Sequence, residues 1–254
     1  MLRVEKLVKR FGGMTAVDEC SFAIGAGRIT GLIGPNGAGK TTCFNMIAGA
    51  LVPSSGRILL EGQDITGLAP HLLYHRGLLR TFQIPREFAR LTVLENLMAA
   101  APDQPGEHIL QNWLAPGRVR AREREVMERA EEALDFLGLS HLRDQAAGNL
   151  SGGQKKLVEL GRTMMVDARL VLLDEPGAGV NPTLMQSIIA MIRRLHEERG
   201  YTFCIIEHDM DLIAELCDPV IVLAGGRVLM EGSMEEVRRD PRVIDAYFGG
   251  EVVA

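Results

Sequence analysis

The most informative stretch of the sequence is Gly34-Pro35-Asn36-Gly37-Ala38-Gly39-Lys40-Thr41-Thr42. It fits the pattern G-x-x-x-x-G-K-[ST] of a phosphate-binding loop. The short apolar segment at residues 28–33 predicts a strand before the loop, and residues 40–50 predict a helix after it. A strand that runs through a glycine-rich turn into a helix indicates an α/β fold with an anion site at the turn.

The residue types in this loop follow from the chemistry of phosphate binding. Glycines let the backbone curl so that successive N–H groups point at phosphate oxygens. The positive N-terminal end of the following helix attracts the same anion. We expect Lys40 to reach the β- and γ-phosphates of a nucleotide, and the Thr41 hydroxyl to ligate Mg²⁺. The predicted nucleotide-binding residues are Gly34, Pro35, Asn36, Gly37, Ala38, Gly39, Lys40, Thr41 and Thr42.

Two acids stand at the end of an apolar run in the second half of the chain. Residues 170–173 are Leu-Val-Leu-Leu, typical of a strand buried on both faces of a parallel sheet, and Asp174 and Glu175 follow directly. Ligands of open α/β sheets bind at the carboxyl ends of the strands. We expect Asp174 to hold the Mg²⁺ shell and Glu175 to polarise or deprotonate the attacking water. The alternative is that the two acids only cap a neighbouring helix or loop where the strand ends.

The segment Leu150-Ser151-Gly152-Gly153-Gln154 predicts a helix start, with a helix continuing over residues 155–165. Ser151 is suited to cap the helix, and glycines at a helix N-terminus allow an anion to approach closely. The loop at residues 34–42 already serves one nucleotide. A second anion site therefore suggests that Ser151, Gly152, Gly153 and Gln154 close over phosphates held by another molecule, although an ordinary helix start is the alternative.

With these motifs in this order, the chain resembles the ABC ATPases over nearly its full length. The matching motifs are Walker A (34–42), LSGGQ (150–154) and Walker B (170–175). The resemblance implies that Gln83 is the Q-loop glutamine, which touches Mg²⁺ and the water and faces the membrane partner. It implies that His208 is the switch histidine at the γ-phosphate, and that Phe11 stacks on adenine. Alone, each residue would be an ordinary strand-end or core residue.

Within this family, the chain resembles ATPases of branched-chain amino-acid importers, the LivG type. The similar segments are 80–83, 91–96, 179–182, 207–210 and 245–249. The D-loop position, residues 177–181, lacks the S-x-L-D form common elsewhere in the family. Asn181 stands where that Asp would be, a variation that LivG-like proteins share. The loop at residues 102–117 matches no family motif.

The resemblance implies a P-loop NTPase fold with a RecA-like core and a mainly parallel sheet. An N-terminal antiparallel β layer and an inserted α-helical subdomain complete it. We expect a single domain over residues 1–254, in which 1–83 and 161–254 form the β layer and core, and about 84–160 form the subdomain with LSGGQ.

Local patterns predict further elements. The alternation of apolar and polar residues over the first thirty positions suits half-exposed antiparallel strands. Residues 221–229 predict a hairpin with a Gly-Gly turn, and Thr92 with Glu95 predicts a capping box. Residues 118–137 predict a charged helix, read as a solvated face rather than an RNA-binding one.

Composition narrows the functional class. The chain has 254 residues, of which 46% are hydrophobic and 24% charged. Its net charge of -5 argues against general electrostatic binding of DNA or RNA. No apolar run reaches the roughly 18–20 residues that span a bilayer. The first residues lack the apolar region of a secretory signal. Any membrane role is therefore expected to be peripheral, and the four cysteines are expected to be reduced thiols.

The resemblance implies ATP and Mg²⁺ as cofactors and a head-to-tail pair of ATPase subunits, either two copies or this chain with a LivF-like relative. It implies transmembrane permease subunits and, indirectly, a periplasmic binding protein that delivers a branched-chain or related amino acid. The chain would lie on the cytoplasmic side of the inner membrane.

The alternatives are an exporter ATPase of the lipopolysaccharide type, a soluble non-transport ABC ATPase and a regulatory module that does not hydrolyse nucleotide. The single cassette and short insert argue against the second, and intact Lys40, Glu175 and His208 against the third. A GTPase is disfavoured because the sequence has no N-K-x-D motif.

Overall fold

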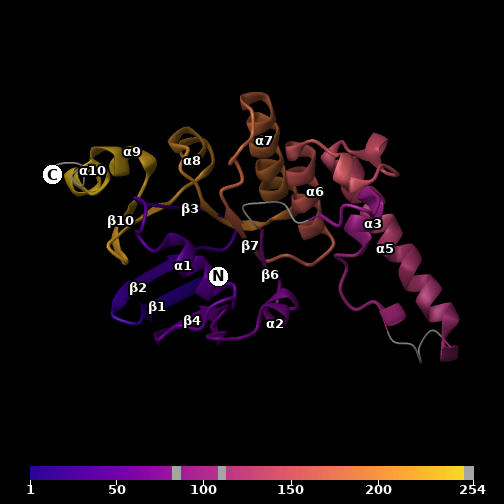
Figure 1. The fold of residues 1–254 in the computed structure, drawn as a ribbon, viewed down its shortest axis with the longest axis horizontal. Coiled ribbons are helices and arrows are strands. Elements are labelled where there is room, and N and C mark those ends of the chain that lie inside the picture. Colours follow the sequence, from indigo (N-terminus) through magenta and orange to yellow (C-terminus); the bar gives the residue numbers. More distant parts are fainter. Residues whose placement is uncertain (82–86, 108–112, 249–254) are drawn as a thin grey trace. The chain divides into compact units, whose positions relative to one another are not determined.

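The computed structural model describes residues 1–81, 87–107 and 113–248 (Figure 1). The chain divides into two compact units. The core unit comprises residues 1–83, 169–178 and 189–254, and the helical unit comprises 84–168 and 179–188. The helical unit contains the predicted helical subdomain, residues 84–160, together with residues 161–168 and 179–188, which the prediction placed in the core.

An antiparallel sheet forms one layer of the core unit. In the described residues its strand order is β2-β1-β4-β5, with bounds β1 Leu2–Phe11, β2 Met14–Ile24, β4 Ser55–Leu60 and β5 Gln63–Asp64. Side chains of β2 alternate between buried and exposed near its end, because only one face of the sheet covers the core. The prediction of half-exposed antiparallel strands at the N-terminus is confirmed.

The second sheet of the core unit carries the predicted site motifs. Its order in the described chain is β10-β9-β3-β8-β7-β6, with bounds β3 Ile29–Ile33, β6 Leu78–Arg80, β7 Leu170–Asp174, β8 Thr202–Ile206, β9 Val220–Ala224 and β10 Arg227–Gly232. All neighbouring pairs are parallel except β9 with β10. Strands β3, β7 and β8 are buried at every residue, which explains their continuous apolar sequences.

The core of this unit lies around helix α1, Lys40–Ile47, which Figure 1 shows beside β1, β2 and β4. Phe44 and Met46 of α1 are fully buried in a cluster with residues of both sheets. The helix predicted for residues 40–50 ends earlier, because the backbone turns at Gly49, whose φ is 71°. The remaining helices that begin in this unit are α2 Pro70–Tyr74, α8 Met210–Leu216, α9 Met234–Arg239 and α10 Pro241–Phe248.

The helical unit is built on α3 Val93–Met98, α5 Pro116–Leu137 and α6 Gly152–Met164, with short 3-10 turns at Pro105–Glu107, Ser140–Leu142 and Ala147–Asn149. Helix α7, Pro182–Arg199, starts in this unit, where the Asn181 side chain accepts the Leu184 N–H at 2.9 Å in the manner of an N-cap. The predicted loop at 102–117 extends too far, because Pro116 and Gly117 form the first turn of α5, where proline needs no N–H partner.

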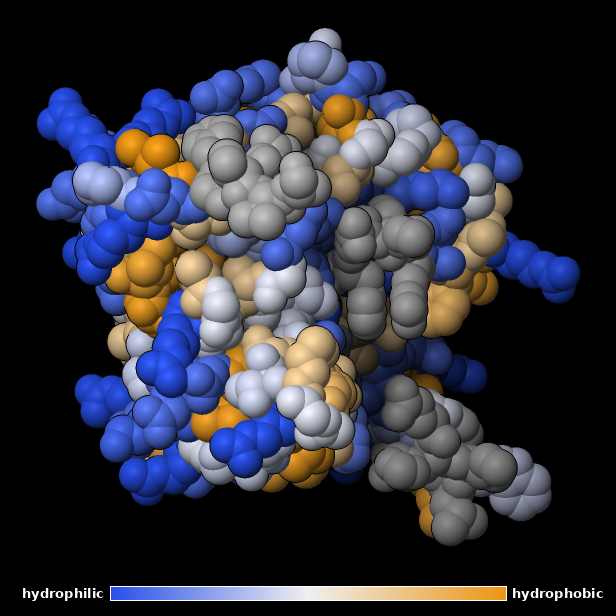
Figure 2. Space-filling model, turned by 60° about the vertical axis from the view of Figure 1, so that its left-hand side comes forward, coloured by the Kyte–Doolittle hydropathy of each residue, from blue (hydrophilic) through white to orange (hydrophobic). Residues whose placement is uncertain are grey.

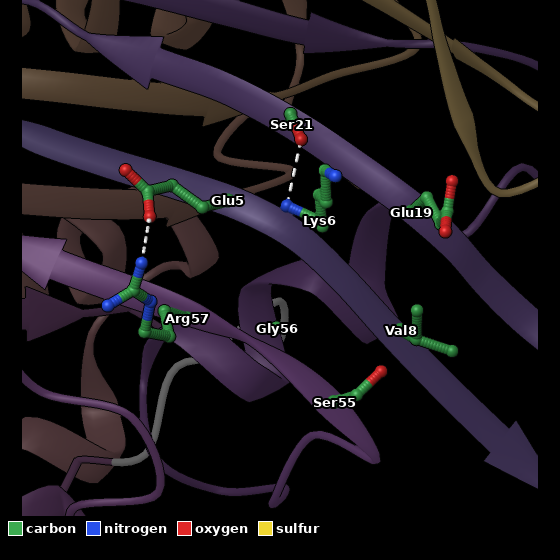
Figure 3. A pocket seen from close by; sticks show the side chains of 8 residues that line it. All are labelled: Glu5, Lys6, Val8, Glu19, Ser21, Ser55, Gly56 and Arg57. Atoms are coloured by element: carbon green, nitrogen blue, oxygen red, sulfur yellow. Dashed lines mark hydrogen bonds and ion pairs between the residues drawn. The ribbon is translucent and has the colours of Figure 1, made fainter.

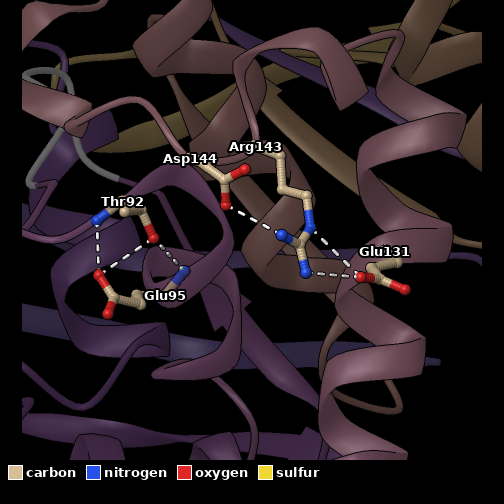
Figure 4. Close-up of polar contacts among 5 residues, drawn as sticks. All are labelled: Thr92, Glu95, Glu131, Arg143 and Asp144. Atoms are coloured by element: carbon tan, nitrogen blue, oxygen red, sulfur yellow. Dashed lines mark hydrogen bonds and ion pairs between the residues drawn. The ribbon is translucent and has the colours of Figure 1, made fainter.

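Figure 4 shows polar contacts at the start of α3 and between α5 and the segment that follows it. The predicted capping box is present: Thr92 Oγ1 accepts the Glu95 N–H at 3.1 Å, and Glu95 Oε2 accepts the Thr92 N–H at 2.8 Å. Arg143 donates to Glu131 of α5 at 2.8 Å and to Asp144 at 2.9 Å. These bonds tie the segment before the α6 helix to α5.

In the part of the chain that the structure describes, no helix combines the length and apolarity needed to cross a membrane. On the face drawn in Figure 2, hydrophilic and hydrophobic residues are intermixed. The four cysteines, Cys20, Cys43, Cys204 and Cys217, are buried free thiols.

Candidate nucleotide-binding site

The loop at residues 34–39 leaves β3 and is held from two sides by the core unit. A Cβ on Gly34 would lie 2.1 Å from the carbonyl oxygen of Leu223 in β9. A Cβ on Gly39, whose φ is 95°, would lie 2.6 Å from the carbonyl oxygen of Ala16 in β2. Only glycine fits at these two positions, because the backbone of two strands presses directly on the loop.

The hairpin turn between β9 and β10 supports the same loop. The Gly226 N–H donates to the Ala38 carbonyl at 3.2 Å, and the Gly226 carbonyl accepts the Asp18 N–H at 2.9 Å. The Gly-Gly turn predicted from the sequence therefore connects the loop to β2, and a side chain at Gly226 would meet Ala16 O at 3.0 Å.

Lys40 is buried, and its side chain folds back over the loop. Lys40 Nζ donates to the carbonyls of Gly34 at 2.6 Å and Pro35 at 3.0 Å. Burial lowers the pKa of Lys40, while the charges of Glu175 and Asp174 oppose that shift. The structure thus brings the predicted phosphate-binding lysine and the two predicted acids into one electrostatic neighbourhood.

Asp174 and Glu175 lie where β7 ends, at the carboxyl edge of the parallel strands. Asp174 is 7% exposed. Glu175 adopts a φ of 49°, which is rare for a residue with a side chain, and its N–H donates to the Ile206 carbonyl at 2.9 Å. His208, just beyond β8, places Nε2 3.1 Å from Glu175 Oε1. Two residues predicted for hydrolysis are therefore in direct contact.

Arg80, at the end of β6, is a site residue that the sequence reasoning missed. Its Nη2 donates to Asp174 Oδ2 at 2.8 Å, and its Nη1 donates to Asn45 Oδ1 of α1 at 2.5 Å. Both charged side chains are nearly buried, with 14% and 9% of their surface exposed. In the sequence, Arg80 belongs to the segment 80–83 that resembles the LivG type, but nothing in that segment pairs it with Asp174.

Phe11 ends β1 and remains 45% exposed. Lys9 Nζ lies 5.2 Å from the centre of its ring. Across the turn, Phe11 pairs with Met14 of β2, two residues before Ala16, whose carbonyl lies against the loop at Gly39. An exposed aromatic ring thus stands on the strand pair that supports the phosphate-binding loop. Gln83, predicted to contact Mg²⁺ and water, lies outside the described residues.

In the helical unit, α6 begins at the predicted LSGGQ segment. Ser151 is the N-cap: its hydroxyl accepts the Gln154 N–H at 3.4 Å, and Gln154 Oε1 accepts the Ser151 N–H at 2.9 Å. Gly152 is exposed, whereas Gly153 is buried and a Cβ there would lie 1.6 Å from Leu184 Cδ2. The sequence explained Gly153 by anion approach alone, and packing against α7 is a second reason for it.

The residues present fit a magnesium-bound nucleotide. Helix α1 begins without a side-chain cap at Gly39, so its first N–H groups face the loop that the glycines shape. The Thr41 hydroxyl and the Asp174 carboxylate offer the oxygen donors that Mg²⁺ prefers. Within the described ranges, no group of three or more His, Cys, Asp or Glu side chains could hold a metal ion. Mg²⁺ bound to substrate phosphates needs only one or two such ligands.

A separate cavity of about 710 Å³ lies on the antiparallel sheet (Figure 3). Lys6 and Glu19 line it where both strands bulge, with φ values of 45° and 47°. Arg57 pairs with Glu5 at 3.2 Å, and the Lys6 N–H donates to Ser21 Oγ at 2.8 Å. None of the predicted site residues lines this cavity.

The ion pair of Arg80 and Asp174 gives a first prediction. Replacing Arg80 by Met keeps the apolar stem but leaves a buried carboxylate without its cation, so the free energy of unfolding should fall by about 3–5 kcal/mol. Urea denaturation measures this loss of stability. The matched control is Arg57→Met, whose ion pair with Glu5 is exposed and should cost at most about 1 kcal/mol. Equal losses in both variants would contradict the assignment.

The two neighbouring glycines of α6 give a second prediction. Gly153→Ala should lower the free energy of unfolding by about 1–3 kcal/mol, because the new methyl group overlaps Leu184. Gly152→Ala should leave it unchanged or raise it, since nothing lies within 4 Å of a Cβ there and alanine is the better helix former. Thermal unfolding of both variants tests the contrast, and a stable Gly153→Ala protein would refute the packing role.

Comparison with known proteins agrees with this geometry. The family model "ABC transporter" matches residues 17–178, and the model "Branched-chain amino acid ATP-binding cassette transporter" matches residues 227–253. The probable branched-chain amino acid transport ATP-binding protein LivG of Methanocaldococcus jannaschii is 43% identical, over 98% of this chain and 97% of that protein. The LivG protein of Archaeoglobus fulgidus, named in the same way, is 41% identical, over 99% and 96%.

Among solved structures, the ADP conformation of an ATP-binding cassette of an ABC transporter superposes with a TM-score of 0.82 at 40% identity, covering 98% of each chain. Family models, full-length relatives and fold all agree with the motifs. The chain therefore belongs to the ABC transporter family and is one of its ATP-binding cassettes.

Proposed function

We propose that this chain hydrolyses ATP to energise the import of a branched-chain or related amino acid through separate membrane subunits. The observation that carries the hydrolytic part is the contact of Glu175 Oε1 with His208 Nε2 at 3.1 Å, at the same sheet edge as the phosphate-binding loop. The amino-acid part is supported by the names of the full-length relatives.

ATP binds across the core unit in this proposal. Phe11 stacks on the adenine, because its exposed ring stands on the strand pair that supports the loop. The loop residues 34–42 cradle the phosphates with backbone N–H groups. Lys40 exchanges its two carbonyl partners, Gly34 and Pro35, for phosphate oxygens. Burial lowers the pKa of Lys40, and the charges of Glu175 and Asp174 oppose that shift.

Thr41, Asp174 and Gln83 would hold Mg²⁺, which when bound would offset the negative charge of the nucleotide phosphates. Arg80 holds the Asp174 carboxylate in place through its contact with Oδ2 at 2.8 Å.

Glu175 accepts a proton from the attacking water, and His208 donates toward the γ-phosphate as charge develops there. Their direct contact supports a shared role, since the histidine orients the carboxylate before substrate arrives. The φ of Glu175 is 49°, and such strain persists only where the surrounding structure enforces it.

The active unit is a head-to-tail pair of cassettes, two copies or this chain with a LivF-like relative. Ser151, Gly152, Gly153 and Gln154 present the start of α6 to the nucleotide on the partner subunit. The exposed Gly152 in the first turn of α6 supports this role, because the N-terminal end of a helix attracts phosphate. The pair lies peripherally on the cytoplasmic side of the inner membrane with permease subunits, which a periplasmic binding protein supplies with cargo.

Substitution of Glu175 by Gln should lower the steady-state rate of ATP hydrolysis by about a hundredfold or more, since the general base is lost. The same variant should convert from monomer to dimer with Mg·ATP, as size exclusion with light scattering would record. Glu197→Gln, an exposed acid on α7, is the matched control and should hydrolyse ATP normally.

Full hydrolysis by Glu175→Gln would remove this residue from its role. A hydrolytically dead variant that stays monomeric would mean that closure needs the membrane subunits, or that the start of α6 serves something other than a partner's nucleotide.

The cargo assignment is tested in proteoliposomes that contain the chain with its co-purifying membrane subunits. We expect ATP-dependent uptake of labelled leucine in the presence of the binding protein, and no uptake with Glu175→Gln. Co-purification with lipid-exporter subunits and no amino-acid uptake would favour the exporter alternative instead.

A further inference from the structure

Glu207 is a buried carboxylate at the start of the LivG-like segment 207–210, and it has no role in the mechanism proposed above. It lies between the end of β8 and His208, and it is 5% exposed. In the described part of the chain, no ion pair joins it to a Lys, Arg or His side chain. A carboxylate without a cation is costly to bury unless several hydrogen bonds compensate it.

Backbone N–H groups provide that compensation, and they come from two different loops. Glu207 Oε1 accepts the Gly177 N–H at 2.6 Å. Glu207 Oε2 accepts the His208 N–H at 2.8 Å and, at a longer 3.4 Å, the Asp209 N–H. An ionised carboxylate is an acceptor on both oxygens, so it can bridge two sets of donors without a proton of its own.

The two loops that Glu207 joins carry the two residues proposed for hydrolysis. Gly177 stands two residues after Glu175, and His208 is the next residue after Glu207. Each loop is thereby fixed on one oxygen of the same carboxylate. The 3.1 Å contact of Glu175 with His208 spans the same two loops.

Glu175 needs such a restraint because its φ of 49° is unfavourable for a residue with a side chain. Its own N–H is fixed to Ile206 at 2.9 Å, and its carbonyl accepts the Ala178 N–H at 3.1 Å. Gly177, which donates to Glu207, belongs to that turn, so this bond holds the turn at the end of β8. Three bonds thus determine one strained conformation.

We propose that Glu207 is a positioning residue for ATP hydrolysis, which sets the register of the Glu175 turn against the His208 loop. This inference rests on the proposed roles of Glu175 and His208. Glutamine at this position matches the volume but offers one oxygen and one NH₂ group. The NH₂ group would then face a backbone N–H of one loop, two donors without an acceptor between them. The Gly177 loop and the His208 loop would therefore separate.

The test compares Glu207→Gln with Glu215→Gln, a matched control whose exposed carboxylate on α8 pairs with Arg193 at 3.1 Å. We expect kcat to fall about tenfold to a hundredfold in Glu207→Gln, because small misplacements of reacting groups cost that much. The Kd for ATP should stay within about twofold, since the hydrogen bonds of Glu207 go to Gly177, His208 and Asp209 and not to the loop at residues 34–42. An unchanged kcat, or a Kd that weakens as much as kcat falls, would overturn the proposal.

A double-mutant cycle separates positioning from general structural damage. Single-turnover hydrolysis is measured for His208→Ala with and without Glu207→Gln. If Glu207 acts through the His208 contact, its substitution should add less than about twofold in the His208→Ala background. The same loss in both backgrounds would mean that Glu207 only stabilises the fold, and would refute the proposal.

Glu207→Asp provides a second variant if the glutamine protein does not fold, because it keeps both acceptor oxygens on a shorter stem. It should show the same loss of kcat and the same non-additivity with His208→Ala. Absence of hydrolysis by the wild-type chain would instead contradict the proposed function itself, which distinguishes the two failures.

Discussion

Parallel pairing of β3, β7 and β8 is the constraint on which the rest of the core unit depends. It brings the ends of three strands to one edge of the sheet, so that Lys40, Asp174 and His208 meet although they are far apart in the sequence. Continuous apolar side chains bury these strands on both faces. A slip of one residue would turn every buried side chain of a strand to the opposite face and move every site residue with it.

Charge balance is the second constraint, because the site gathers ionised groups where water is scarce. The Lys40 cation lies among carbonyl oxygens and near two acids, and Asp174 is matched by Arg80. Glu207 is instead compensated by backbone dipoles alone. Each of these buried charges thus has its own means of compensation.

Much of the fold and of the site could be predicted because the deciding signals are local. The capping box of Thr92 and Glu95 lies within three residues, and the phosphate-binding loop lies within nine. Arg80 and Glu207 escaped prediction because their partners are 94 and 30 residues away. Such bonds follow from strand register, which no short pattern encodes. The helix start at Pro116 was missed because proline and glycine also mark loops.

The turn at Gly225 and Gly226 is a poor place for an insertion, although it joins two strands of a hairpin. Hairpin turns at a protein surface are usually the places where insertions are tolerated. Here the turn donates from Gly226 to Ala38 and accepts from Asp18, so its backbone belongs to the wall of the phosphate-binding loop. An affinity tag or a longer loop inserted at this turn would disturb the nucleotide site, because Gly226 is buried although its neighbour Gly225 is exposed.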